Sequence, residues 1–418
     1  MNINDIYRVK IERLDDQGRG IGKVNDKTIF VANTLIDEIV DVKIINIKKK
    51  FVEGEVVKYI EISNKRIKPI CKYFEYCGGC DLMHLNYDEQ LKYKQDKVKR
   101  IINKFSNIDS NLVTDIIGSK NNLNYRNKIT LHINNGIGLY KRKSNDIIKI
   151  DECLITDKRI NDIIKLINDN ISISNTKEII IKASKNTNDL MIIFDANSID
   201  KEKIIDVFKN KVTSIMLKKD DNYSLVYGKD YIIEEIGNFK FMISADSFFQ
   251  VNTNQAEILY NKVLEYADLS KDDYLLDLYC GTGTISLYLS NYVHKVLGIE
   301  INKYAIRNAL KNKELNNINN AEFICSDVSK LVNNINFKPT VIVVDPPRSG
   351  LDKVTINYVL NSNVKKLIYV SCDSITLARD LSLLNQKYEV KKITPVDMFP
   401  NTCHVECVVL LSLKTLKK

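Results

Sequence analysis

Hydrophobic and polar residues alternate with a period of two over residues 1–62, and glycines interrupt the alternation. Val40, Val42 and Ile44 fall on one face of their segment, and Val52 matches them on the next segment if a break at Gly54 is allowed. Short alternating segments separated by turns predict a small closed β-barrel. The five expected strands cover residues 7–14, 18–24, 28–35, 38–45 and 51–60.

A mixed pattern follows in residues 63–235. Residues 87–105 place Leu91, Val98, Ile101 and Ile102 at helical spacing, which predicts an amphipathic helix. Apolar, β-branched runs predict strands further along, at residues 128–133, 178–184 and 190–195. We therefore expect a central domain of mixed α/β structure.

From Tyr274 onward the strands become apolar throughout, and a loop and a helical segment follow each of them. This sequence pattern is typical of a parallel sheet covered by helices on both faces. Such sheets bind ligands at the carboxyl ends of their strands. The chain is thus predicted to be an α/β protein with an OB-like barrel (1–62), a mixed α/β central domain (63–235) and a Rossmann-like domain (236–418). The expected strands of the last domain are 274–279, 295–300, 321–327, 340–345 and 366–371.

Composition narrows the class of protein. A chain of 418 residues with 44% hydrophobic positions is long enough for two or three packed domains and too apolar to be disordered. No apolar run approaches the length of a membrane span, so we expect no membrane association. Nine sparse cysteines and a charged, non-signal start indicate a reducing, cytoplasmic location, where thiols serve metal binding, catalysis or packing. The net charge of +9 is spread along the chain, and a Lys-rich solvated surface explains it as well as RNA binding does.

A glycine loop follows the first strand of the last domain, in residues 277–284. Gly281 and Gly283 allow a tight turn close to a ligand, whereas Ser286 occupies the third glycine position of a dinucleotide loop. The spacing is similar to the DxxxGxG loop of S-adenosylmethionine-dependent methyltransferases. Glu300 ends the second strand, where a carboxylate can bind ribose hydroxyls, and Asp327 ends the third strand, where it suits an adenine amino group. Either acid alone could simply be solvated or cap a helix, but together they favour a nucleoside cofactor.

Three further residues stand at strand ends and can carry chemistry. Asp345 precedes two prolines that hold it rigidly at the mouth of the expected site. Cys372 ends the fifth strand and is either a buried core thiol or a nucleophile, and its position favours the nucleophile. Glu406 begins the last apolar strand, either on an exposed edge or as a general base aimed into the pocket.

Three cysteines lie within ten residues, and two glycines between them allow the backbone to fold around a metal. Cys71, Cys77 and Cys80 form this group, and Cys153 is the candidate fourth ligand. Their spacing favours a metal over packing in a reducing compartment, but it leaves zinc and a 4Fe-4S cluster as alternatives.

Taken together, these motifs resemble the RNA 5-methyluridine methyltransferase family. The resemblance is carried by the DPPR loop from Asp345, the SCD motif around Cys372 and the DMFPNTCHVE segment at 397–406, and the first 62 residues resemble a TRAM domain. It implies a class I methyltransferase domain, with Cys372 adding to carbon 6 of uracil and Glu406 removing the proton from carbon 5. It also implies a 4Fe-4S cluster at the four cysteines above and S-adenosyl-L-methionine as cofactor. The cofactor-binding residues that it implies are Gln250, Tyr279, Glu300, Asp327 and Asp345.

The expected partner is RNA. The barrel and the cysteine set favour 23S rRNA as the substrate, with the TΨC-loop uridine of tRNA as an alternative. A non-catalytic RNA-binding protein is a second alternative, which the complete set of Cys372, Glu406 and cofactor residues disfavours. We expect a monomer without an obligate protein partner. Residues proposed to contact RNA, unless they form a solvated face, are Tyr125, Arg126, Lys128, Tyr140, Lys141 and Arg142.

Overall fold

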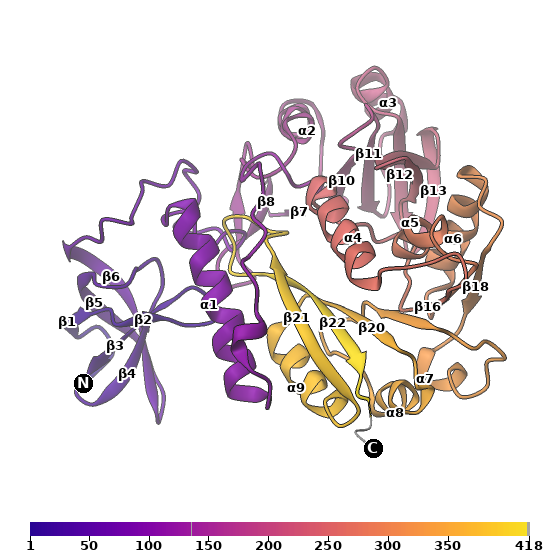
Figure 1. The fold of residues 1–418 in the computed structure, drawn as a ribbon. Coiled ribbons are helices and arrows are strands. Elements are labelled where there is room, and N and C mark those ends of the chain that lie inside the picture. Colours follow the sequence, from indigo (N-terminus) through magenta and orange to yellow (C-terminus); the bar gives the residue numbers. More distant parts are fainter. Residues whose placement is uncertain (135, 416–418) are drawn as a thin grey trace.

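The computed structural model describes residues 1–134 and 136–415, and within them three large sheets follow one another along the chain (Figure 1). The N-terminal sheet has the strand order β1-β5-β6-β4-β3-β2. Because β1 and β2 are joined by two residues and yet stand at opposite ends of this order, the sheet closes into a barrel. Its strands are β1 (Ile6–Lys10), β2 (Arg13–Leu14), β3 (Gly20–Val24), β4 (Lys27–Val31), β5 (Ile39–Ile47) and β6 (Phe51–Glu61).

The barrel confirms the predicted core face and corrects one detail. Val40, Val42 and Ile44 are fully buried. The first expected strand is divided into β1 and β2. The Ile11 N–H bonds to the carbonyl of Glu38, just before β5, whereas the Glu12 N–H bonds to β3, so the chain changes partner there. Strand β6 runs through Gly54, and its register with β5 shifts at this residue, where an interruption was predicted.

A long helix connects the barrel to the rest of the molecule. Helix α1 (Tyr87–Phe105) has the predicted bounds, and Asn86 caps it by accepting a hydrogen bond from the Glu89 N–H. Val98, Ile101 and Ile102 are buried in the same cluster as residues of the C-terminal sheet, so α1 packs against helix α9 (Ser374–Leu384) far along the chain (Figure 1). The short 3-10 helix η1 (Ser110–Leu112) follows it.

The central sheet has the order β13-β12-β11-β10-β7-β8-β9 and buries isoleucine-rich faces against helices α2 (Lys158–Asn170) and α3 (Lys201–Phe208). The three strands predicted for this part are all present, as β7, β10 and β11. A two-stranded hairpin, β14 (Tyr231–Ile236) and β15 (Phe239–Ser244), leads out of it. The strands of the sheet are β7 (Lys128–Ile133), β8 (Ile137–Tyr140), β9 (Ile147–Lys149), β10 (Thr176–Ala183), β11 (Leu190–Ala196), β12 (Ser214–Lys219) and β13 (Asn222–Gly228).

The C-terminal sheet has the order β18-β17-β16-β19-β20-β22-β21. The first five strands in this order are parallel to one another, β22 is antiparallel to β20, and β21 is antiparallel to β22. This is the expected Rossmann-like sheet, and its order reverses between β16 and β19. Its strands are β16 (Tyr274–Leu278), β17 (Lys295–Glu300), β18 (Ala321–Cys325), β19 (Val341–Val344), β20 (Lys366–Ser371), β21 (Tyr388–Val396) and β22 (Glu406–Leu413). Helices α4 (Thr253–Ala267), α5 (Thr284–Ser290), α6 (Lys303–Leu315), α7 (Val328–Leu331) and α8 (Lys353–Ser362) accompany α9 around it.

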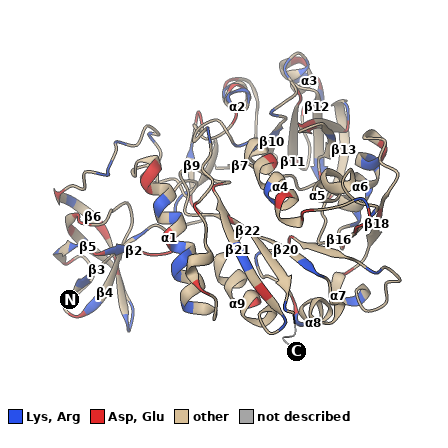
Figure 2. Cartoon of the chain, viewed as in Figure 1, with Lys and Arg blue, Asp and Glu red and all other residues tan. Residues whose placement is uncertain are grey.

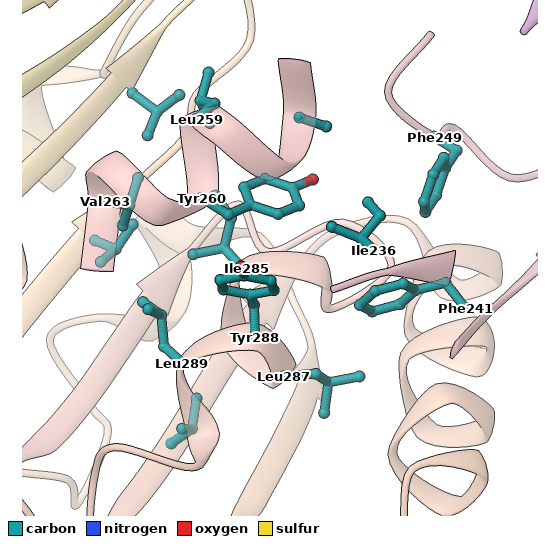
Figure 3. Close-up of a cluster of buried hydrophobic side chains, with 14 of the residues drawn as sticks. Ile236, Phe241, Phe249, Leu259, Tyr260, Val263, Ile285, Leu287, Tyr288 and Leu289 are labelled. Atoms are coloured by element: carbon teal, nitrogen blue, oxygen red, sulfur yellow. The ribbon is translucent and has the colours of Figure 1, made fainter. Parts of the chain in front are cut away.

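An aromatic core joins the hairpin to this sheet. Phe241 of β15, Tyr260 of α4 and Tyr288 of α5 lie together among aliphatic side chains (Figure 3). The ring centroids of Tyr260 and Tyr288 are 5.6 Å apart. Full burial of one large apolar side chain such as Phe241 contributes about 1.5–3 kcal/mol, so this core fixes the hairpin and α4 relative to the sheet.

Lys and Arg residues occur on the barrel, on α1 and on the C-terminal helices, in keeping with the dispersed net charge (Figure 2). In the part of the chain that the structure describes, no helix has the length and apolar character needed to cross a membrane.

Candidate functional site

A pocket of about 490 Å³ opens at the carboxyl ends of β16, β19 and β20, where the sheet order reverses. The structure brings five of the predicted site residues together around it. Tyr279 follows β16, Asp345 follows β19 and Cys372 follows β20, while Glu406 begins β22 and Gln250 comes from the segment before α4. Each of these five side chains lines the pocket: Gln250, Tyr279, Asp345, Cys372 and Glu406.

The glycine loop is built from left-handed backbone. Gly281 and Gly283 have φ of 54° and 78°, and a Cβ on Gly283 would lie 2.8 Å from the Phe323 ring, so only glycine fits there. Tyr279 also has a positive φ, 65°, which is uncommon for a large side chain and marks strain at this loop. The Gly281 N–H donates to the Glu300 carboxylate at 3.2 Å, so Glu300 lies against the loop that it was predicted to complete.

Glu300 and Asp327 are outside the set of residues that line the pocket. Strand β18 ends at Cys325, two residues earlier than predicted, and Asp327 caps α7 by accepting hydrogen bonds from the Ser329 N–H and hydroxyl. The Oε1 atom of Glu300 accepts from the Asn302 N–H at 2.8 Å. Their contacts with a nucleoside stay predictions.

Three carboxyl groups, of which those of Asp277 and Glu406 are buried and that of Asp345 is partly buried, line the pocket. Burial raises the pKa of Asp277 to about 7, of Asp345 to about 7 and of Glu406 to about 8, and Asp345 further raises the value for Glu406. One oxygen of Asp277 accepts from the Ser286 hydroxyl at 2.5 Å, whereas the other has no protein partner. Sequence reasoning placed Asp277 in the glycine motif but missed it as a site residue, although it is the first acid of that motif. A cationic ligand would relieve the repulsion among these groups.

Cys372 and Glu406 share this environment. Burial and the Glu406 carboxyl raise the pKa of the Cys372 thiol to about 11, and Arg348 acts in the opposite direction on both groups. His404 lines the same pocket, and burial together with Arg348 lowers its pKa, so it stays neutral. Phe248, of which 69% is exposed, and Phe399 also line the pocket. Both were missed in the sequence, although Phe248 stands two residues before Gln250.

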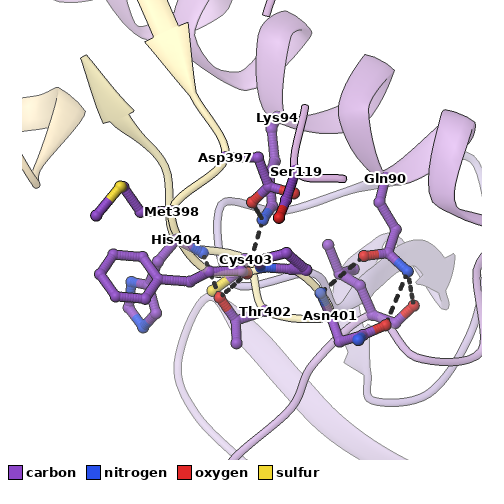
Figure 4. A network of polar contacts seen from close by, with 12 residues as sticks. Gln90, Lys94, Ser119, Asp397, Met398, Asn401, Thr402, Cys403 and His404 are labelled. Atoms are coloured by element: carbon purple, nitrogen blue, oxygen red, sulfur yellow. Dashed lines mark hydrogen bonds and ion pairs between the residues drawn. The ribbon is translucent and has the colours of Figure 1, made fainter. Parts of the chain in front are cut away.

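Helix α1 holds the loop that leads into Glu406. The Lys94 ammonium lies 2.5 Å from Asp397 Oδ1 with both side chains fully buried, and it also donates to the Phe399 carbonyl (Figure 4). Gln90 accepts from the Asn401 N–H at 2.9 Å and donates to its side chain (Figure 4). The segment that leads into Glu406 is therefore held by contacts with a helix some 300 residues away in the sequence.

The four predicted metal ligands also come together. Cys71, Cys77, Cys80 and Cys153 line one small cavity of about 30 Å³, with Phe74, Met83, Tyr125 and Ile155 packed around it. The Gly79 N–H donates to the Cys77 sulfur at 3.4 Å, a contact that would stabilise a thiolate. No group of three His, Cys, Asp or Glu side chains among residues 1–134 and 136–415 is arranged to hold a single metal ion.

The residues proposed to contact RNA divide into two sets. Tyr125 is buried and donates to the Pro400 carbonyl, so its assignment to RNA is wrong. Arg142 donates from its two terminal nitrogens to Asp81 and to the Cys80 carbonyl, and its Nε is buried without a partner among the described residues, so its guanidinium is directed into the protein. Tyr140 is exposed and stacks on His132 with 3.9 Å between ring centroids, which leaves it available to a base.

The sheet order, the glycine loop and the acidic pocket at the switch point define a Rossmann-like methyltransferase that uses S-adenosyl-L-methionine. Comparison with known proteins supports this assignment to the methyltransferases. Residues 86–414 match the model of the tRNA (uracil-5-)-methyltransferase family, and residues 2–57 match the TRAM domain. The chain therefore belongs to the tRNA (uracil-5-)-methyltransferase family and is an S-adenosylmethionine-dependent RNA methyltransferase with an N-terminal TRAM domain.

Individual relatives cover nearly the whole chain. An uncharacterized RNA methyltransferase of Clostridium tetani is 38% identical over 98% of this chain and 96% of its own length. Another, from Staphylococcus aureus, is 36% identical over 98% of this chain and 99% of its own. The crystal structure of the Pyrococcus abyssi tRNA (uracil-54, C5)-methyltransferase in complex with S-adenosyl-L-homocysteine superposes with a TM-score of 0.80. It shares 30% identity and covers 97% of this chain and 99% of that one.

Proposed function

We propose that this protein transfers a methyl group from S-adenosyl-L-methionine to carbon 5 of a uridine in 23S rRNA, through a covalent adduct between Cys372 and carbon 6. The observation that carries the proposal is that Cys372 and Glu406 face one acidic pocket together with the candidate cofactor residues. A nucleophile and a base in a shared pocket are what methylation at an unactivated ring carbon requires.

In the proposed reaction, the Cys372 thiolate forms a bond to carbon 6 of uracil, and the electron pair of the 5,6 double bond moves toward carbon 5 as an enolate. Carbon 5 then forms a bond to the methyl group while the bond between that methyl and the sulfonium breaks, leaving S-adenosyl-L-homocysteine. Glu406, once it has lost its own proton, takes the proton from carbon 5 as a carboxylate. The electron pair of that C–H bond re-forms the 5,6 double bond, and the bond between sulfur and carbon 6 breaks to return the thiolate. The target base first leaves its stack, at a cost of about a few kcal/mol.

The electrostatics of the pocket support this order of events. A thiol with a pKa of about 11 is mostly protonated at neutral pH, so the free protein holds Cys372 in its unreactive form. A sulfonium bound beside Asp277 and Asp345 would offset their negative charge and lower the pKa of the thiol. Cofactor binding would thereby favour the nucleophilic form of Cys372.

We assign cofactor binding to Gln250, Tyr279, Glu300, Asp327 and Asp345. Gln250, Tyr279 and Asp345 line the pocket, and Glu300 is hydrogen-bonded to the glycine loop, which supports the assignment for these four. The free oxygen of Asp277 adds a sixth candidate, suited to an ammonium group of the cofactor.

A 4Fe-4S cluster fits the chemistry of the cysteine cavity, and we propose it with Cys71, Cys77, Cys80 and Cys153 as ligands. In such a cluster each thiolate binds its own iron, so the four sulfurs surround a volume rather than converge on one ion. Four thiols line one cavity, which provides one ligand for each iron of such a cluster. Because the methyl transfer has no redox step, the cluster would serve structure. Purification without oxygen is expected to give a brown protein with a broad band near 400 nm.

The RNA substrate has two candidates. The barrel and the cysteine set motivate 23S rRNA, whereas the likeness to an archaeal enzyme that acts on uridine 54 of tRNA favours tRNA. We propose that the protein works in the cytoplasm, since either RNA is found there. We also propose that it works as a monomer.

The experiment that tests the reaction uses purified protein, radiolabelled cofactor and transcripts of 23S rRNA and tRNA. We expect labelled 5-methyluridine in the rRNA, none with Cys372→Ala, and accumulation of a covalent RNA adduct with Glu406→Gln, because adduct formation precedes proton removal. Cys325→Ser, which alters an exposed thiol outside the pocket, is the matched control. Methylation by Cys372→Ala would overturn the mechanism, and label in tRNA alone would reassign the substrate.

A further inference from the structure

The segment that carries Gln250 lies outside regular structure. It joins β15 to α4 over residues 245–252 and places Phe248, Phe249 and Gln250 at the pocket. An irregular segment without sheet or helix hydrogen bonds needs other partners for its backbone carbonyls, because buried carbonyl groups without partners are costly. The central sheet provides those partners.

Lys182, near the end of β10, is one of them. Only 6% of this residue is exposed, and its ammonium donates three hydrogen bonds, each of 2.9 Å, to the carbonyl oxygens of Ser244, Ala245 and Ser247. An ammonium has three donors, so all of them are used on the last residue of β15 and on the segment that follows it. The stabilising contacts of Lys182 are these three carbonyl oxygens. Of the charged groups near it, Lys128 lowers its pKa and Asp246 raises it, and burial lowers the value to about 7.

Asn127, just before β7, is the other. Its N–H donates to the Val251 carbonyl at 2.8 Å, and its side-chain amide donates to the Gln250 carbonyl at 3.0 Å. The same amide reaches the Thr253 hydroxyl at 3.1 Å, which in turn donates to the buried Glu234 carboxylate at 2.7 Å. Lys182 and Asn127 thus hold five carbonyl groups of a segment that contains three pocket residues.

We infer that Lys182 and Asn127 are positioning residues for cofactor binding: from the central sheet they hold residues 244–251 so that Gln250 and the two phenylalanines face the cofactor. This inference deepens the proposed function, since it rests on the assignment of Gln250 to the cofactor. Neither residue lines the pocket, so both act through the backbone of this segment.

The test is Lys182→Met, which keeps the length of the side chain and removes its three donors. Lys177→Met changes an exposed lysine of the same strand and is the matched control. Affinity for S-adenosyl-L-homocysteine is measured by calorimetry, and kcat and KM for the cofactor are measured with RNA in excess. We expect about tenfold weaker binding and about tenfold higher KM for Lys182→Met, with kcat at saturating cofactor and RNA affinity changed less than about twofold; the tenfold corresponds to losing roughly one net charged hydrogen bond.

A second variant covers the case in which Lys182→Met does not fold. Asn127→Ser removes the amide that holds the Gln250 carbonyl, and about threefold weaker cofactor binding is expected. Unchanged cofactor affinity in a folded Lys182→Met or Asn127→Ser protein would overturn the inference. Gln250→Ala separates this result from a failure of the proposed function: if Gln250→Ala binds the cofactor product as the unmodified protein does, the assignment of Gln250 fails. If it binds weakly and Lys182→Met does not, the positioning role alone fails.

Discussion

The buried ion pair between Lys94 and Asp397 gives the sharpest stability prediction. Both side chains are fully buried, and the Asp397 carboxylate has the Lys94 ammonium on one oxygen and the Tyr87 hydroxyl on the other, at 2.5 Å and 2.8 Å. Lys94→Met would leave a buried carboxylate with one neutral donor. Removal of one partner from a buried pair costs about 3–5 kcal/mol, because the remaining charge is desolvated without compensation.

A double-mutant cycle isolates the pair. Asp397→Asn keeps an acceptor for Tyr87 but leaves the Lys94 ammonium uncompensated, so we expect a similar loss of about 3–5 kcal/mol. The double variant Lys94→Met/Asp397→Asn contains no buried charge, and we expect it to lose less than the sum of the single losses by at least about 2 kcal/mol. Lys92→Met, on the exposed side of the same helix, should cost less than about 0.5 kcal/mol, since its ion pair with Glu89 is at the surface.

Urea unfolding followed by circular dichroism measures these differences, and hydrogen exchange of residues 90–101 and 397–403 locates them. Exchange should accelerate in both segments of Lys94→Met, because the helix and the loop stabilise each other through this pair. Two results would refute the view that the pair holds residues 397–403 against α1. One is single losses that add within about 0.5 kcal/mol, and the other is a loss below about 1 kcal/mol for Lys94→Met.

Two further predictions concern the pocket and the barrel. Glu406 has a pKa raised from 4.5 to about 8, so the folded protein retains a proton that the unfolded chain releases, and stability falls as pH rises from about 4.5 to 8. Glu406→Gln does not titrate at this position. Its melting temperature should therefore exceed that of the unmodified protein by a difference that grows as pH rises from about 4.5 to 8. A difference that stays constant over this pH range would contradict the raised pKa of Glu406. In the barrel, a Cβ on Gly54 would lie 2.2 Å from Val42 Cγ1, so Gly54→Ala should cost about 1–3 kcal/mol in urea unfolding. Adding Val42→Ala to Gly54→Ala should recover part of that loss, because it removes the atom that the new Cβ meets. Glu55→Ala, on the same strand, is the control and should be neutral. If Gly54→Ala costs the same with Val42 and with Ala at position 42, crowding is not the cause.

Sequence patterns predicted the parts of this molecule that depend on local periodicity. The bounds of α1 and the order of strands and helices after Tyr274 follow from residues close in the chain, as does the glycine loop at the end of β16. The same periodicity could not show that Lys94 and Lys182 are buried, because a lysine on a helix or strand is normally exposed and its partners here lie 62 to 305 residues away. Tyr125 was misassigned for the same reason, since its partner Pro400 is 275 residues distant.

These distant contacts all reach the two chain segments that line the pocket or lead into it, so they join the central part of the chain to the C-terminal sheet. The central sheet holds residues 244–251 through Lys182 and Asn127, and α1 holds residues 397–401 through Lys94 and Gln90. Asp81, next to the last cysteine of the cluster motif, accepts a hydrogen bond from the Cys403 N–H at 3.1 Å. The two pocket segments are also joined to each other, since the Asn252 and Gln255 side chains donate to the carbonyl oxygens of Met398 and Asp397. The side chains proposed to perform the chemistry, Cys372 and Glu406, stand on the Rossmann-like sheet. The backbone that carries Gln250 and leads into Glu406 is held by residues that precede it in the chain. We therefore expect that loss of the central part would disable the proposed site and leave the sheet itself intact.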